Sequence, residues 1–277
     1  MIIVKKALFF VVFFSGCLNA KSLYNDLHQI AIDFSFSDIE QLQQEAKNGN
    51  IKSKYLIASH MLHNEQKKEE GVKILEELAA ADIVDAKYSL YMASSWVNVE
   101  DLTEEKAIRY LKDSAQENYA ESQVELARAY ITGKYVKKDL PLYHYWIEKA
   151  AEQGHADALI YTASDYYIGR GVNKDEIKGF QWLMRAYNLL GRNFIRWGML
   201  GHVYENGLGT SVDLAKAYMC YDLDGTAGIE DKARIAPHMT PEQRAEGLRL
   251  SQEWQEKNHV YTMQSLGLTR QKDGSYQ

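Results

Sequence analysis

The feature that most constrains this sequence is a short motif that recurs at a nearly constant spacing. Each copy opens with a tyrosine, at Tyr130, Tyr166 and Tyr204, and these tyrosines are 36 and 38 residues apart. A glycine follows three residues after each tyrosine, and an aspartate closes the motif six residues later. A repeat of this length is one supersecondary unit that cannot bury its apolar face alone, so it must stack on a neighbour. The spacing therefore predicts a solenoid.

Within one unit, the pattern indicates two helices joined by a turn. Leu126, Ala127 and Tyr130 stand at i, i+1 and i+4, which places them on one face of a first helix. The small residue recurs as Ala163 and Gly201, where it would permit close approach of a neighbouring helix. The glycine suits the turn that ends this helix. The closing aspartate suits the first position before a second helix, where its carboxylate accepts bonds from free backbone N–H groups.

Weaker signals of the same repeat extend towards the N-terminus. Ala79, Ala115 and Ala151 are each one period of 36 residues apart. Two earlier units, at about 51–81 and 85–118, keep these alanines but lack the glycine turn. We expect their connections to be shorter or differently shaped.

The string from Trp146 to Ala158, Trp-Ile-Glu-Lys-Ala-Ala-Glu-Gln-Gly-His-Ala-Asp-Ala, resembles the core of a Sel1-like repeat. The turn from Gly169 to Asp175 is similar to the G-x-G-V-x-x-D loop of that family. The good matches span about 120–217, and weaker ones extend back to Ile51. This resemblance implies an all-α fold, a right-handed α/α superhelix of helix-turn-helix repeats related to tetratricopeptide repeats. It also implies a scaffold or adaptor role, without naming a partner.

The C-terminal part is expected to close the array. The segment from Met239 to Ala245 resembles the helix that often follows the last unit of such arrays. Thr240 is the predicted N-cap, with Pro241 at the first helical position and Gln243 completing a capping box. The helix is expected to end near Lys257, with three residues turned inward: Ala245, Leu248 and Trp254. The predicted organisation is a repeat solenoid of about five units at 51–221, a connector and capping helix at 222–268, and a mobile tail at 269–277.

The N-terminus has the features of an export signal over residues 1–20. Lys5 and Lys6 precede an apolar run of eight residues, which is too short to span a bilayer as a helix. Phe14-Ser-Gly-Cys17 resembles a bacterial lipobox, which makes Cys17 a candidate for lipidation, although leucine is usual where Phe14 stands. Cleavage after Ala20 is the alternative. Helices are expected at 23–50, where Ser37-Asp-Ile-Glu40 is typical of a capping box.

Charge and composition exclude several classes of function. The formal net charge is −6, and removing the first twenty residues with their two lysines leaves −8. Without a long run of Lys and Arg, nucleic acid is not an expected partner. No second apolar stretch is long enough for a transmembrane segment. The only cysteines are Cys17 and Cys220, so an internal disulfide framework is not expected.

The sequence contains no convincing catalytic or metal-binding motif. His60 and His63 stand at i and i+3 near a helix end, but no third ligand is close to them in the sequence, and we interpret them as solvated. Asp222, Asp224, Gly225 and Glu230 are spaced too closely for an EF-hand loop, so a turn after a helix is the better interpretation. Some cysteine-rich Sel1-like proteins are described as β-lactamases, but the paired cysteines of their repeats are missing here. We therefore predict a protein without cofactor, metal or catalytic activity.

A binding surface is predicted from the first helices, which line the concave face in related solenoids. The candidates are positions off the Leu/Ala/Tyr core stripe: Tyr88, Met92, Val124, Arg128, Ile160, Ser164, Tyr167, His202 and Glu205. Exposed aromatic residues and arginine are enriched in binding hot spots. The resulting hypothesis is an exported adaptor, in the periplasm or cell envelope, that binds a protein or peptide. The alternative is a cell-envelope enzyme or a peptidoglycan-associated regulator.

Overall fold

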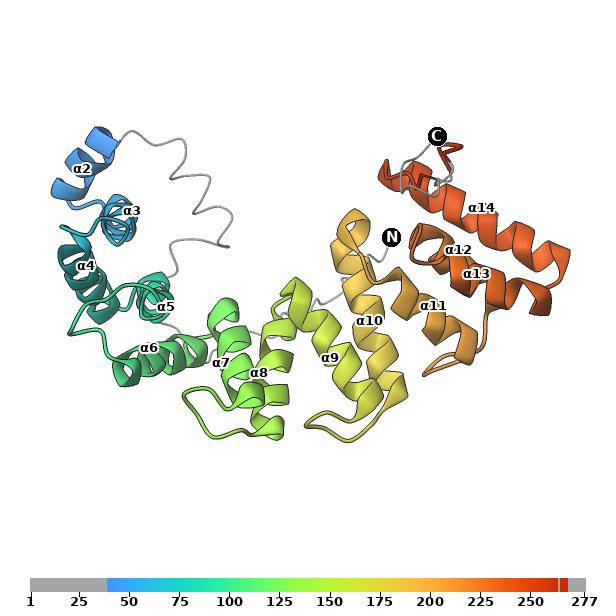
Figure 1. Ribbon diagram of the computed structural model, residues 1–277, viewed down its shortest axis with the longest axis horizontal. Helices are drawn as coiled ribbons and strands as arrows, with labels where there is room; N and C mark the ends of the chain where they lie inside the picture. Colours follow the sequence, from blue (N-terminus) through green and yellow to red (C-terminus); the bar gives the residue numbers. More distant parts are fainter. Residues whose placement is uncertain (1–38, 264, 269–277) are drawn as a thin grey trace, which may run out of the picture. The chain divides into compact units, whose positions relative to one another are not determined.

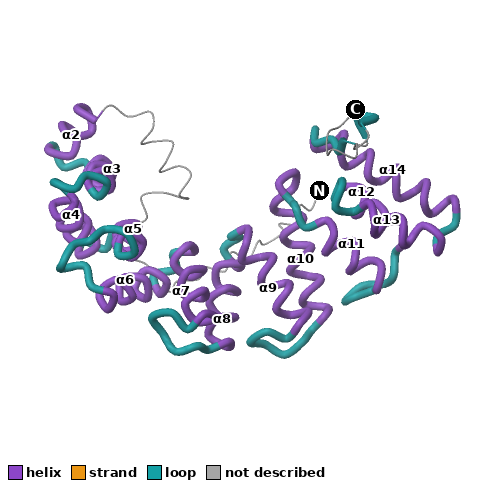
Figure 2. Tube along the Cα trace, viewed as in Figure 1, coloured by secondary structure: helices purple, strands orange, loops and turns teal. Residues whose placement is uncertain are grey.

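The computed structural model describes residues 39–263 and 265–268, and all regular secondary structure in this part of the chain is helical. Figure 2 shows helices and loops without any strand in the described part. The chain divides into two compact units, one ending at Tyr119 and the other beginning at Ala120. The predicted signal peptide, Cys17 and the tail at 269–277 lie outside the described residues.

The first unit contains α2 and two helix pairs. Its helices are α2 (Ile39–Lys47), α3 (Ile51–Met61), α4 (Lys68–Ala80), α5 (Val84–Ala93) and α6 (Glu104–Gln116). Consecutive helices pack against one another around Leu75, Leu90 and other fully buried side chains. The alanines that mark the period, Ala79 and Ala115, are buried. Residues 62–67 join α3 to α4, and residues 94–103 join α5 to α6. These two connections differ from one another and from the glycine turns.

The second unit contains three helix pairs and the C-terminal helices (Figure 1). The first helices of the pairs are α7 (Ala120–Thr132), α9 (Ala156–Ile168) and α11 (Trp197–Asn206). The second helices are α8 (Leu140–Glu152), α10 (Glu176–Leu190) and α12 (Leu214–Leu223). They are followed by α13 (Ile229–Ile235) and α14 (Pro241–Asn258), and short 3-10 turns lie at Gly191–Asn193 and Ala236–His238.

The turns inside these pairs form as the motif predicts. Gly169 and Gly207 end their helices in the left-handed conformation, with φ of 73° and 68°. The aspartate that follows each turn caps the second helix: Asp139, Asp175 and Asp213 accept the N–H of the residue three positions on, at 2.9, 3.0 and 3.0 Å. The prediction of a glycine stop followed by an aspartate cap is confirmed, because both features depend on backbone geometry within a few residues.

The small residues of the first helices allow the predicted close packing. Ala127 and Ala163 are fully buried, and Gly201 takes their place in the third pair. A Cβ at Gly201 would lie 2.6 Å from the ring of Tyr221, so this position has no room for a side chain. The rows of small residues therefore set how closely each first helix approaches its partner.

The C-terminal helix caps the array as predicted, but with a different buried face. Thr240 and Gln243 form the capping box, and α14 packs on α12. Trp254 is buried as expected, whereas Ala245 and Leu248 are exposed, so that part of the prediction is wrong. The buried face consists of Gly247, Ser251, Trp254 and Gln255. Small and polar residues dominate this buried face because α14 lies close to α12 and donates a hydrogen bond to a buried aspartate, Asp222.

Candidate protein-binding surface

The first helices of the second unit expose one aligned row of polar side chains. Arg128 on α7, Ser164 on α9 and His202 on α11 occupy equivalent positions, 36 and 38 residues apart. The Arg128 side chain is 63% exposed and pairs with Glu125 of the same helix at 3.0 Å. Ser164 is half-buried and His202 is exposed. Three of the nine predicted site residues therefore share one register and remain accessible.

Two neighbouring residues on α9 were missed from the sequence. Tyr161 is 40% exposed and Ile168 is 60% exposed, and each lies within one helical turn of Ser164. Apolar residues occur around the whole of α9, so the helical period does not reveal which of them turn outward. An exposed tyrosine and isoleucine beside a polar row extend the accessible surface of the first helices.

Three of the predicted residues are buried, and this corrects their assignment to an exposed face. Val124 and Ile160 are each 8% exposed and belong to the core of the second unit. They are one period apart, so the same error in helical phase applies to both. Tyr88, in the first unit, is 6% exposed and its ring packs against Tyr119 at 5.4 Å between centroids. Residues of this size turn inward once a neighbouring helix is present to cover them.

Met92 and Tyr167 differ from one another in their surroundings. Met92 on α5 is 43% exposed in the first unit. Tyr167 on α9 is half-buried, and its ring lies so near α10 that a Cβ at Gly179 would approach it to 3.0 Å. Burial raises the pKa of the Tyr167 phenol well above its ordinary value. Tyr167 therefore contributes to packing between helices as well as to the accessible surface.

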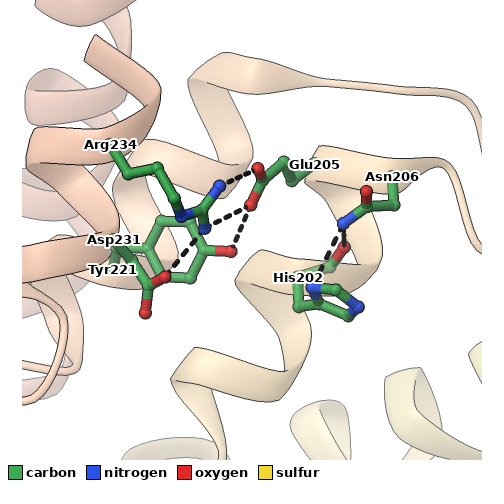
Figure 3. Close-up of polar contacts among 6 residues, drawn as sticks. All are labelled: His202, Glu205, Asn206, Tyr221, Asp231 and Arg234. Atoms are coloured by element: carbon green, nitrogen blue, oxygen red, sulfur yellow. Dashed lines mark hydrogen bonds and ion pairs between the residues drawn. The ribbon is translucent and has the colours of Figure 1, made fainter.

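Glu205 on α11 is held in a polar cluster by residues from two later helices (Figure 3). Its carboxylate accepts two hydrogen bonds from the guanidinium of Arg234 on α13, one of them from Nη2 at 2.9 Å. The Tyr221 hydroxyl of α12 donates to the same carboxylate at 2.7 Å. Asp231 bonds Arg234 at 2.7 Å from within α13. These hydrogen bonds, with that from Arg234 the strongest, lower the pKa of Glu205 below its usual range.

Glu205→Gln is expected to destabilise the protein by about 1 kcal/mol at neutral pH, because Arg234 loses one of its two ionic partners at a half-exposed site. Glu205 has a lowered pKa in the folded state, so its contribution is present above the unfolded pKa of about 4.3 and is lost as pH falls through the lower folded value. Urea denaturation of both proteins at a series of pH values measures this. A difference that stays constant down to the acid limit would contradict the assignment.

His202 and Asn206 form a second contact on the same helix. Asn206 Nδ2 lies 3.1 Å from Nδ1 of His202 and donates to the His202 carbonyl at 3.0 Å (Figure 3). This side-chain contact restrains the imidazole at the end of the polar row while leaving it exposed. An ordered, accessible side chain loses less conformational entropy when it binds.

The other residues considered as metal ligands in the sequence take part in packing, ion pairs or hydrogen bonds within the protein. His63 stacks on Trp96 with ring centroids 4.7 Å apart. Asp222 is buried between Lys232 and Ser251, and Asp224 accepts the backbone N–H of Gly198. In the described part of the chain, no group of three or more His, Cys, Asp or Glu side chains is arranged to hold a metal ion. No helix there is both long enough and apolar enough to cross a membrane.

Comparison with known proteins gives the repeat a family. The Sel1 repeat model matches residues 120–155, 156–189 and 199–223, which are the three helix pairs of the second unit. A protective antigen of uropathogenic Escherichia coli strains with an SLR fold aligns with a TM-score of 0.61 and 22% identity, covering 79% of this chain and 48% of its own. A Sel1 repeat protein from Oxalobacter formigenes aligns with a TM-score of 0.56 and 22% identity, covering 75% of this chain and 87% of its own.

These comparisons establish the fold and the repeat type. The chain spans about half the length of the Escherichia coli antigen. No curated protein matches the sequence significantly. At 22% identity, the two solved structures show a shared fold alone. The repeat matches fall on the helix pairs and agree with the helical fold: this chain contains three Sel1 repeats between residues 120 and 223.

Proposed function

We propose that this chain is an exported, non-enzymatic adaptor that binds a protein or peptide through the concave face formed by its first helices. The observation that carries the proposal is the aligned, accessible row of Arg128, Ser164 and His202 on three consecutive first helices. Sel1 repeats are typical of protein-interaction scaffolds. A repeated array offers a continuous surface to one partner because equivalent positions recur at each unit.

The proposed surface differs from that expected from the sequence. Tyr88, Val124 and Ile160 are removed from it because they are buried. In the second unit the surface keeps Arg128, Ser164, Tyr167, His202 and Glu205, and it gains the exposed Tyr161 and Ile168. Tyrosine and arginine supply large contact areas at interfaces, whereas serine and histidine supply adaptable hydrogen bonds. This mixture fits a protein or peptide better than a small molecule, since the residues lie in a row along several helices.

Export is proposed from the N-terminal sequence. Lys5 and Lys6 followed by the apolar run from Ala7 to Phe14 are typical of a secretory signal. The same segment leaves two mature forms open, a lipoprotein anchored at Cys17 or a protein cleaved after Ala20. Metabolic labelling with a fatty acid distinguishes them, because Cys17→Ser abolishes the label only in the first case.

A photo-crosslinker tests the binding face directly. Benzoylphenylalanine in place of Tyr161 is expected to crosslink a partner in an envelope extract, because the side chain is 40% exposed on α9. The matched control is the same replacement at Tyr145, which is 48% exposed on the second helix α8. Adding Arg128→Ala is expected to reduce the crosslink at position 161 roughly tenfold, as loss of an arginine hot spot would.

Equal crosslinking from positions 145 and 161, unaffected by Arg128→Ala, would exclude the first-helix face as the binding surface. The purified protein also needs testing on peptidoglycan and on a chromogenic β-lactam. Turnover by rigorously pure material would favour the enzymatic alternative over an adaptor.

A further inference from the structure

The three turns inside the helix pairs of the second unit have the same backbone geometry. They span 133–139, 169–175 and 207–213, and we call them loop 1, loop 2 and loop 3. Each is closed by a backbone bond from its aspartate N–H to the carbonyl of the repeated tyrosine, at 3.0, 2.9 and 2.9 Å. Each also has two residues with left-handed backbone, the first and the third of the loop. The three loops therefore share one backbone conformation but differ in their side chains.

The structure places these loops along one edge of the unit. Loop 2 abuts the start of α8, since a Cβ at Gly171 would lie 2.0 Å from the carbonyl oxygen of Leu140. Loop 3 abuts the start of α10 in the same way, since a Cβ at Gly209 would lie 2.0 Å from the carbonyl oxygen of Glu176. Loops 1 and 2 lie at the same edge of the helix pairs in Figure 2. Residues far apart in the sequence thus become neighbours.

Loop 1 differs chemically from the other two. It reads Lys134-Tyr-Val-Lys-Lys138, whereas loop 3 has Leu-Gly-Thr-Ser-Val at the same positions. Tyr135 has a φ of 66° where loops 2 and 3 have glycine at 69° and 73°. A side chain in this conformation costs about 1 kcal/mol. Tyr135 therefore adopts this conformation at an energetic cost, and its ring lies 4.6 Å from the ammonium of Lys134.

The cations of this edge are accessible, while its carboxylates are occupied. Lys134, Lys137 and Lys138 are exposed, and within the described residues Lys137 and Lys138 take part in no ion pair. In loop 2, Lys174 is 60% exposed but pairs with Glu176, and Arg170, which is 34% exposed, pairs with Asp165 at 3.5 Å. The aspartates that close the loops accept backbone N–H bonds as helix caps, and Glu176 pairs with Lys174 at 2.8 Å. A partner would therefore meet positive charge chiefly at loop 1, on Lys137 and Lys138.

We propose that this loop edge, centred on Lys134, Tyr135, Lys137 and Lys138, binds the surface of an anionic lipid bilayer. Lysines beside an anionic membrane are attracted to its surface potential, and tyrosine is favoured at the level of the lipid headgroups. The half-buried Tyr135 and Val136 lie between Lys134 and Lys137 in the sequence. This arrangement suits a bilayer surface, where charged headgroups cover an apolar interior.

Vesicle sedimentation of the full chain tests the proposal. Vesicles of phosphatidylcholine mixed with phosphatidylglycerol are expected to bind the protein, with affinity falling as salt is raised, and vesicles of phosphatidylcholine alone to bind it much less. The double variant Lys137→Asn with Lys138→Gln should weaken binding to the anionic vesicles roughly 30-fold at low salt, about fivefold for each lysine. Tyr135→Gly should weaken vesicle binding and at the same time raise the midpoint of urea denaturation, because it relieves the left-handed tyrosine.

The matched control is Lys67→Gln with Lys257→Gln, which changes two exposed lysines outside the three loops and alters the net charge by the same amount. Every variant keeps the same N-terminus, so differences among them report on the loop edge. An equal loss in the control would show that net charge alone is responsible, and unchanged binding after the Lys137 and Lys138 changes would overturn the proposal. It would also be overturned if those changes abolished binding to duplex RNA or an acidic protein while leaving vesicle binding intact.

Discussion

Gly171→Ala is expected to lower the free energy of unfolding of the second unit by about 3 kcal/mol. Two costs combine at this position. The backbone has a φ of 69°, where a side chain costs about 1 kcal/mol, and the added Cβ would lie 2.0 Å from the Leu140 carbonyl oxygen. The loop or the start of α8 must therefore move, and such overpacking costs roughly 1–3 kcal/mol.

Gly169→Ala separates these two costs within the same loop. Gly169 has a φ of 73°, but the nearest atoms to an added Cβ are 3.5 Å away, which is ordinary contact. The expected loss is therefore about 1 kcal/mol, from the backbone alone. Urea denaturation followed by tryptophan fluorescence measures both, because all but one of the five tryptophans lie beyond residue 120. Equal losses from the two variants would show that contact between successive repeats does not constrain Gly171.

Truncation before Thr240 is expected to leave the helix pairs folded but prone to aggregation. Removing α14 uncovers α12, where Gly247 lies so close that a Cβ would be 2.8 Å from the carbonyl oxygen of Ala215. It also removes Trp254, whose ring lies 4.8 Å from that of Trp197. Loss of such a buried tryptophan alone costs about 3–5 kcal/mol. Size-exclusion chromatography and the midpoint of urea denaturation report the two effects.

The same deletion breaks a buried polar network. Ser251 donates to Asp222 at 2.6 Å, and Gln255 donates to Ser251 at 3.0 Å. Lys232 of α13 pairs with the other oxygen of Asp222. Without α14, the carboxylate keeps its lysine, and water replaces the serine donor at the uncovered site, so this loss costs less than the about 1–3 kcal/mol of a group left buried without its bond.

Two point variants and a shorter deletion serve as controls for the cap. Trp254→Ala should cost several kcal/mol, whereas Leu248→Ser, at a position 47% exposed, should change stability by less than about 0.5 kcal/mol. Deleting residues 269–277 alone is expected to leave the melting temperature unchanged. A large drop on deleting that tail, or none on deleting α14, would place the cap elsewhere.

Features that depend on a few consecutive residues were predictable from this sequence. The glycine stop, the aspartate cap and the capping box at Thr240 each depend on one or two residues and on backbone groups within four residues of them. The recurrence of these signals every 36 to 38 residues added the helix-pair repeat, because identical local structures at a fixed spacing leave few ways to stack. The alanine and glycine rows predicted close helix packing for the same reason.

Which side of each helix faces inward was decided by the tertiary structure. On α14, the helical period of apolar residues indicated Ala245 and Leu248, yet the buried side contains Gly247 and Ser251 because α12 approaches closely and Asp222 needs a donor. On the first helices, Val124 and Ile160 turned out to be covered by neighbours. A single helix with apolar residues on several faces does not specify its own orientation, since burial depends on what packs against it.

The candidate surfaces depend on the tertiary structure even more strongly. Arg234 reaches Glu205 across 29 residues, and Tyr161 becomes exposed although its neighbours on α9 are buried. Loops 1 and 2 carry their lysines to one edge only because Gly171 lets successive repeats touch. The sequence alone determined that this chain forms helix pairs and where the three pairs of the second unit turn, since those signals are local. The accessible faces were decided by packing between pairs, because exposure and charge clustering arise from contacts between residues distant in the chain.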